Sequence, residues 1–266
     1  MLIITRLFSI DPHLGRIDHA TLSQQSLMEM LISGITTSAK KICGDAENPT
    51  NIDEWRGVGV NEAGEVRTIN WCVFHLHGSL ALEWLPCTLY TLHANANALT
   101  GSLGLTALPP KMIAFCVNSN RHTGEVDLCH LPATLEELNL SWNRLSGSLH
   151  LTELPDCLED LFLQGNSFSR EIQLNKLPPS LQNLNVSENQ LSGTIDVSTL
   201  SSKLEKLFVQ KNRLTGHTDF RLLPQTLRQI NVSLTMLSGE IAINEALQGE
   251  FNVVSSGVQL VLKSSE

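Results

Sequence analysis

The sequence predicts a repeat solenoid of mixed α/β type, a right-handed horseshoe or arc of thin turns. A parallel β-sheet is expected on its concave face and a mostly irregular chain on its convex side. Two observations predict this fold. First, the phrase L-x-x-L-x-L-x-x-N begins again every 23 residues, at Leu135, Leu158, Leu181 and Leu204, and a fixed period of this length is typical of solenoids. Second, 42% of residues are hydrophobic but only 5% aromatic, which suits thin leucine layers better than one large core.

The repeat extends in both directions from its four complete copies. Stepping back by 23 residues gives Met112–Asn120 and Leu89–Asn97, and a further step reaches Val66. Stepping forward gives a looser copy from Leu227, with Thr235 in the asparagine place. Eight units therefore occupy residues 66–249 without insertion or deletion.

The second half of the unit also recurs. Leu145-Ser-Gly-Ser-Leu149 returns as Leu191-Ser-Gly-Thr-Ile195. Together the two phrases resemble those of the leucine-rich-repeat family, and the L-S-G-x-I/L half resembles its plant-type and protist subclass. The plant-type repeats occur in receptor ectodomains and in protein inhibitors of secreted enzymes, so the resemblance implies a protein or peptide partner.

The spacing assigns a place to each side chain of the unit, whose first residue we number position 1. Positions 1, 4, 6, 11, 15, 17 and 20 are apolar and point inward, and the alternation within L-x-L predicts a short strand. Strands of successive units stack about 4.8 Å apart as a parallel sheet. The asparagine at position 9 also points inward, where its amide satisfies backbone groups of the turns. The predicted ladder comprises Asn97, Asn120, Asn143, Asn166, Asn189 and Asn212.

The remaining segments are predicted to cap the stack, because the end turns of a solenoid need covering. Residues 1–65 form the N-terminal cap, with a helix over about 22–33 and a capping box at Thr21–Gln24. The stretch from Trp55 to Val58 resembles the plant-type cap phrase W-x-G-V, although its flanking cysteines are missing. Residues 250–266 form the C-terminal cap, in which the 23-residue register is lost and Gly257–Leu262 is a last strand over the open edge.

Positions 3, 5, 7 and 8 are expected to face the concave surface, where repeat proteins usually bind. Position 5 alternates asparagine with phenylalanine from the fourth unit on, and position 7 alternates serine with glutamine. Exposed aromatics beside polar groups are typical anchors of an interface. The alternative is that these aromatics only pack on neighbouring strands. The predicted partner-binding residues are Phe162, Phe208, Trp142, Glu137, Asp160, Lys206, Gln164 and Gln210.

Charge changes along this face at position 3, from Glu137 and Asp160 to Lys206. Such a gradient orients a partner, and the alternative is an ordinary solvated face. Three N-x-S triplets begin at Asn139, Asn185 and Asn231. We interpret them as products of the repeat rather than as glycosylation sites, because they fall at one place in alternate units.

No sequence feature predicts catalysis, a metal or a cofactor. The six cysteines form no closely spaced pair, so free thiols are expected. His93 and Cys116 should lie on adjacent strands, but a metal site there lacks a fourth ligand. Nucleophile, phosphate-loop and zinc-protease motifs are absent from the sequence, so we predict that the protein is not an enzyme.

The predicted function is a non-catalytic interaction module that binds a protein or peptide on the concave sheet. The alternative is a structural subunit of a larger assembly. A formal charge of −9 argues against a nucleic-acid partner, and no apolar run is long enough to span a membrane. We expect a cytoplasmic location, with secretion or the cell surface and mitochondrial import as alternatives. The oligomeric state does not follow from the sequence.

Overall fold

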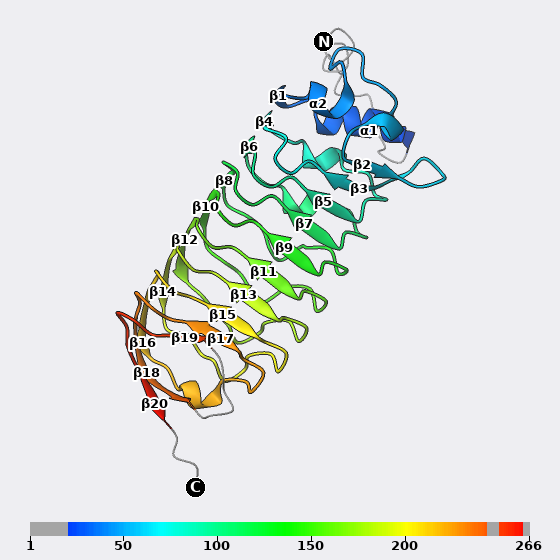
Figure 1. Ribbon diagram of the computed structural model, residues 1–266. Coiled ribbons are helices and arrows are strands. Elements are labelled where there is room, and N and C mark those ends of the chain that lie inside the picture. The colour runs from blue at the N-terminus through cyan, green and yellow to red at the C-terminus, as the bar shows by residue number, and fades with distance from the viewer. Residues whose placement is uncertain (1–20, 244–249, 263–266) are drawn as a thin grey trace, which may run out of the picture.

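The computed structural model describes residues 21–243 and 250–262 of the 266-residue chain. Its turns stack side by side into one elongated solenoid, with the N-terminal cap at one end (Figure 1). The predicted fold class, a parallel-strand solenoid with few helices, is confirmed. The N-terminal residues 1–20, on which the expectations about import signals depend, lie outside the described residues.

A ten-stranded sheet runs the length of the stack, and its neighbours are parallel except at the first pair. Each inner strand holds positions 3 to 5 of one unit, so Leu161 pairs with Leu138 on one side and Leu184 on the other. The strands are β2 (Val58–Val60), β3 (Val66–Asn70), β5 (Thr91–His93), β7 (Ala114–Cys116), β9 (Glu137–Asn139), β11 (Asp160–Phe162), β13 (Asn183–Asn185), β15 (Lys206–Phe208), β17 (Gln229–Asn231) and β19 (Glu250–Asn252).

The return side of the stack carries a second parallel sheet, of seven strands, beside short 3-10 turns (Figure 1). The sequence analysis did not predict this sheet. Leucine at position 11 points into the core between polar residues at positions 10 and 12, which is the alternation of a half-buried strand. Its strands are β8 (Thr123–Gly124), β10 (Arg144–Gly147), β12 (Ser167–Glu171), β14 (Gln190–Gly193), β16 (Arg213–His217), β18 (Met236–Ile243) and β20 (Gly257–Leu262).

Near the N-terminal cap a three-stranded sheet continues this side of the stack. It joins β1 (Ile35–Thr37), β4 (His77–Gly78) and β6 (Ala98–Leu99), with β1 antiparallel. The 3-10 turns that complete the return are η4 (Leu82–Trp84), η5 (Leu105–Ala107) and η6 (Phe220–Leu222).

Leucines from both sides of every turn form one continuous core. At positions 1, 4 and 6 the apolar side chains are almost fully buried in each unit, as at Leu158, Leu161 and Leu163. Burial of such a side chain contributes about 1.5–3 kcal/mol relative to exposure. No turn could bury these groups alone, so the core exists only in the stacked form.

The six position-9 asparagines join the turns from inside. Asn143 shows the shared pattern: its Nδ2 donates to the carbonyl oxygens of Val117 (3.1 Å) and Leu140 (3.1 Å). Its Oδ1 accepts from the backbone N–H of His122 at 3.0 Å. Corresponding bonds are made by Asn97, Asn120, Asn166, Asn189 and Asn212. Each amide thus bonds backbone groups of its own turn and of the preceding turns.

The N-terminal cap closes one end of the core. Helix α1 (Gln24–Leu31) lies within the predicted range, but the predicted capping box is wrong, because Ser23 is the N-cap and accepts from the N–H of Ser26. Gln24 instead reaches the first repeat, where its Oε1 accepts from the N–H of Val66 at 2.9 Å. Helix α2 (Lys40–Cys43), η3 (Ile52–Glu54) and the antiparallel strand β2 complete the cap.

At the other end the repeat continues for a ninth turn with a shorter step. Strand β19 pairs with β17 through Gln229 and Glu250, which are 21 rather than 23 residues apart. The 23-residue register therefore ends as expected, but the ten-stranded sheet does not end with it. Strand β20, the predicted last strand, extends the second sheet rather than the first.

A histidine occupies one of the apolar positions of the core. His122 occupies position 11, where most units have leucine, and only 2% of it is exposed. Its Nδ1 lies 3.3 Å from the carbonyl oxygen of Gly101, and its buried Nε2 has no hydrogen-bond partner in the described chain. Burial lowers the pKa of His122 to about 4.

We predict that His122 makes stability depend on pH between about 6.5 and 4. In this window the unfolded chain binds a proton that the folded chain does not, so stability falls as the pH falls. From pH 7.5 to 4.5 the imidazole should account for a loss of about 2–3 kcal/mol. Urea unfolding of wild type and of His122→Leu at pH 7.5 and 4.5 measures this loss of stability. An equal loss in both proteins would contradict the assignment.

Candidate functional site

The candidate site is the face of the ten-stranded sheet that points away from the core, which we call the open face. Its position-5 side chains form one column, because the register pairs them strand by strand. The column runs from β3 to β19 as Asn70, His93, Cys116, Asn139, Phe162, Asn185, Phe208, Asn231 and Asn252.

Phe162 and Phe208 are the aromatic members of this column. Both are half-buried, and each lies between two asparagines of the neighbouring strands, with Asn185 shared between them. The backbone order therefore places two phenylalanine rings two strands apart on a polar background. This arrangement is the one that the 46-residue alternation in the sequence predicts.

Glutamine at position 7 accompanies each phenylalanine. The Oε1 atoms of Gln164 and Gln210 are buried and have no hydrogen-bond partner among the described residues. The intervening units differ, since the Ser187 hydroxyl donates to Asn185 Oδ1 at 2.7 Å. Buried amide oxygens without a partner in the described chain also occur at Asn183, in an N-x-S unit, and at Asn95 and Asn118, at position 7 of earlier units.

Trp142 lies at the end of this surface, at position 8. The chain is left-handed at this position in every unit, and Trp142 has φ 54° with half of its surface exposed. The next unit has Gly165 here, and a Cβ on it would lie 2.5 Å from Cε3 of Trp142. The missing side chain of Gly165 therefore makes room for the indole.

The position-3 charges also lie side by side. Glu137, Asp160, Asn183 and Lys206 pair in register across β9 to β15. Asp160 accepts a hydrogen bond from Asn183 Nδ2, and Glu137 Oε1 accepts from the Cys116 thiol at 3.2 Å. The order from acid to base that the sequence predicts is therefore present on one surface.

In the described chain, Cys116 beside Glu137 and Ser148 beside His150 each bring a nucleophile next to an acid or base. Burial, and then the charge of Glu137, raises the pKa of the Cys116 thiol strongly, so this thiol is a poor nucleophile. Ser148 Oγ lies 3.0 Å from His150 Nε2 on an exposed stretch, but no described carboxylate orients the imidazole, as a triad requires. Within the described chain no cluster of three metal-binding side chains occurs, and all six cysteines are unpaired.

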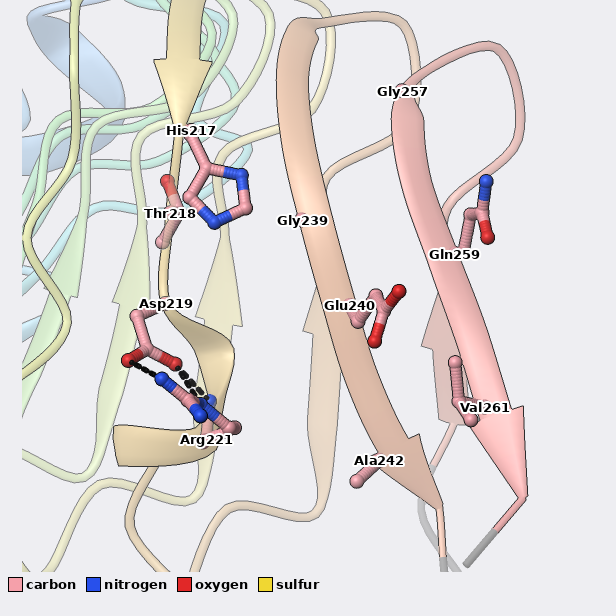
Figure 2. Close-up of a pocket in the computed structure, with 10 residues that line it drawn as sticks. All are labelled: His217, Thr218, Asp219, Arg221, Gly239, Glu240, Ala242, Gly257, Gln259 and Val261. Carbon is pink, nitrogen blue, oxygen red and sulfur yellow. Dashed lines mark hydrogen bonds and ion pairs between the residues drawn. The ribbon is translucent and has the colours of Figure 1, made fainter.

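A cavity of about 690 Å³ lies near the C-terminal end, between η6 and the outer side of β18 and β20. Figure 2 shows that Asp219 and Arg221 form one wall and that Glu240 and Gln259 extend from the strands opposite. Arg221 Nη2 lies 2.7 Å from Asp219 Oδ2 and lowers the pKa of Asp219 to about 2. The repeat phrase could not reveal this cavity, because it depends on the second sheet.

Comparison with known proteins supports the repeat assignment. The Leucine Rich Repeat family matches residues 134–156. Among solved structures, the chain is similar to the plant peptide hormone receptor RGFR1 in complex with RGF2. The identity is 25% and the TM-score 0.53, over 68% of this chain and 35% of that one. No curated protein matches the chain by sequence.

Two further structures share the fold. One is the Arabidopsis receptor kinase HAESA in complex with the peptide hormone IDA and the co-receptor SERK1 (18% identity, TM-score 0.58, 89% of this chain and 50% of that one). The other is a plant ice-binding protein (15% identity, TM-score 0.50, over 91% of this chain and 95% of that one). The chain spans a third to a half of the two receptor chains. No helix of the described residues is long and apolar enough to cross a membrane.

We predict that Gly165→Ala destabilises the protein by about 1–2 kcal/mol, because the new methyl group displaces the Trp142 indole. The left-handed backbone accounts for part of this cost, about 1 kcal/mol, because φ is 68° at Gly165 and any residue with a Cβ is strained there. Urea unfolding of the single variants and of Gly165→Ala with Trp142→Ala forms a double-mutant cycle. The part of the cost that is due to the indole should vanish when Trp142 is absent. An unchanged cost would show that the backbone, not the indole, requires glycine.

Proposed function

We propose that the protein is a non-catalytic interaction module that binds a protein or peptide across the open face. The observation that carries the proposal is the pair of half-buried rings, Phe162 and Phe208, two strands apart on the open face, each beside a partly exposed glutamine, Gln164 or Gln210. A half-buried aromatic ring beside polar groups is a typical anchor of an interface, because a partner that covers it buries the rest of its apolar surface.

The dimensions of the face suit such a partner. Ten strands span nine steps of about 4.8 Å, or roughly 43 Å in total. This length matches interfaces of standard size, which bury about 800 Å² per partner. Further support comes from the two receptor structures that share the fold, which contain peptide ligands by their descriptions. We also assign the repeats to the plant-type L-S-G-x-I/L subclass, on the phrases at Leu145 and Leu191.

A second candidate function, a structural subunit of an assembly, is favoured by the C-terminal end. Of nine exposed large apolar residues in the described chain, five lie within residues 227–262. Leu234, Met236 and Val254 are each more than half exposed there. The edge strands β19 and β20 lie at the same end, and exposed apolar groups beside sheet edges favour association.

One capture experiment separates the two functions. The variant Phe162→Asn with Phe208→Asn gives both units the asparagine that their neighbours have, so the fold should be unchanged. The control Leu234→Lys gives the eighth unit the lysine that the seventh has at Lys211. Both proteins are used as bait in extracts of the native cells, and captured proteins are quantified by mass spectrometry alongside the melting temperature.

We predict that the double asparagine variant loses its specific partner at least about thirtyfold, as expected for two anchor residues of about 1 kcal/mol or more each. Its melting temperature should match that of wild type, and Leu234→Lys should retain the partner. The opposite result, with capture lost only in Leu234→Lys, would contradict binding on the open face and favour the assembly subunit.

A further inference from the structure

The alternation of asparagine and phenylalanine along the open face sets the distance between the two phenylalanines, and a ligand that contacts both must match this distance. Phe162 on β11 and Phe208 on β15 are separated by the single strand β13. Two strand steps of about 4.8 Å place equivalent atoms of the two units roughly 9.6 Å apart along the stack. The glutamines at position 7 repeat with the same spacing, so the face presents two like sites rather than one.

Only some peptide conformations place equivalent side chains at this spacing. A β-strand puts side chains on one face about 6.7 or 13 Å apart. An α-helix repeats a face after two turns, at about 10.8 Å. A polyproline II helix has three residues per turn and a rise of about 3.1 Å, so every third residue returns to the same face after about 9.3 Å. The polyproline II repeat is the one nearest to the spacing of the two sites.

The chemistry of each site fits the same ligand. A polyproline II backbone makes no internal hydrogen bonds, so its carbonyl and N–H groups are free. The side chains of Gln164 and Gln210 are partly exposed on this face, and an amide side chain can donate to such carbonyl groups. Aromatic side chains provide the flat apolar surface on which extended proline-rich segments dock.

Charge gives the bound peptide a direction. Glu137 and Asp160 lie on β9 and β11 beside the Phe162 site, and Lys206 lies on β15 beside the Phe208 site. A complementary ligand is basic at the end over β9 and acidic at the end over β15, because such pairs fix register and orientation.

Building on the proposed function, we propose that the open face between β9 and β15 binds a proline-rich peptide in the polyproline II conformation. The peptide has an aliphatic residue at every third position, a basic end over β9 and an acidic end over β15. Phe162 and Phe208 contact the two aliphatic residues, and Gln164 and Gln210 bond the peptide backbone between them.

Three fluorescein-labelled synthetic peptides test this proposal by fluorescence anisotropy with the full chain. The first, RRPPLPPLPPDD, places its leucines three residues apart. The second, RRPLPPPPLPDD, has the same composition but places them five residues apart. The third, RRTLTLTLTLDD, has the two-residue period of a β-strand. Each is titrated with wild type and with the variant Phe162→Asn, Phe208→Asn.

The first peptide should bind wild type at least about tenfold more tightly than the second, and the double variant should lose this preference. Tighter binding of the β-type peptide that depends on the two phenylalanines would overturn the polyproline conformation but leave the proposed function standing. If no peptide shows binding that depends on the phenylalanines, the inference is overturned, and the capture experiment alone decides the proposed function.

Discussion

The structure depends on satisfying the backbone polar groups that each thin turn buries when it stacks on the next. A buried N–H or C=O without a partner costs about 1–3 kcal/mol, and every turn bends inward at its ninth position. The asparagine there supplies two donated bonds and one accepted bond, as Asn189 does toward Leu163, Val186 and Phe168. Because these bonds reach other turns, they hold the turns in one register while the leucines fill the space between them.

That register also sets the geometry of the open face. Phe162 and Phe208 are 46 residues apart in the chain, yet the ladder places them on strands separated by one neighbour. The side chains need no pocket to be held, since the strands beneath them are fixed by the core. A solenoid can therefore hold two like groups at a constant distance, and under the proposal above that distance selects the conformation of the ligand.

The regular part of this structure could be predicted from the sequence, because each residue of the repeat occupies an environment that recurs. The inward positions and the column from Asn139 to Asn231 follow from the 23-residue step. The rest depends on local contacts without a periodic pattern. The room for Trp142 depends on Gly165, and the cavity beside Arg221 depends on the ninth turn. The second sheet does recur with the repeat, at positions 10 to 13, but its pairing between turns was not predicted from the alternation around position 11. Ser23, rather than the expected Thr21, is the helix cap. Gln24, the other member of the predicted capping box, is bonded to the first repeat, which is a contact that no periodic pattern indicates.

Hydrogen exchange at single residues tests the central claim most directly. The backbone N–H groups of Leu99, Leu145, Phe168 and Leu191 each donate to the Oδ1 atom of the next turn's asparagine, at 2.9–3.0 Å. These amides should exchange at least about a thousandfold more slowly than unprotected amides, with protection recurring every 23 residues. Exchange within about tenfold of the unprotected rate at these positions would contradict the account, because the asparagine ladder would then not join the turns.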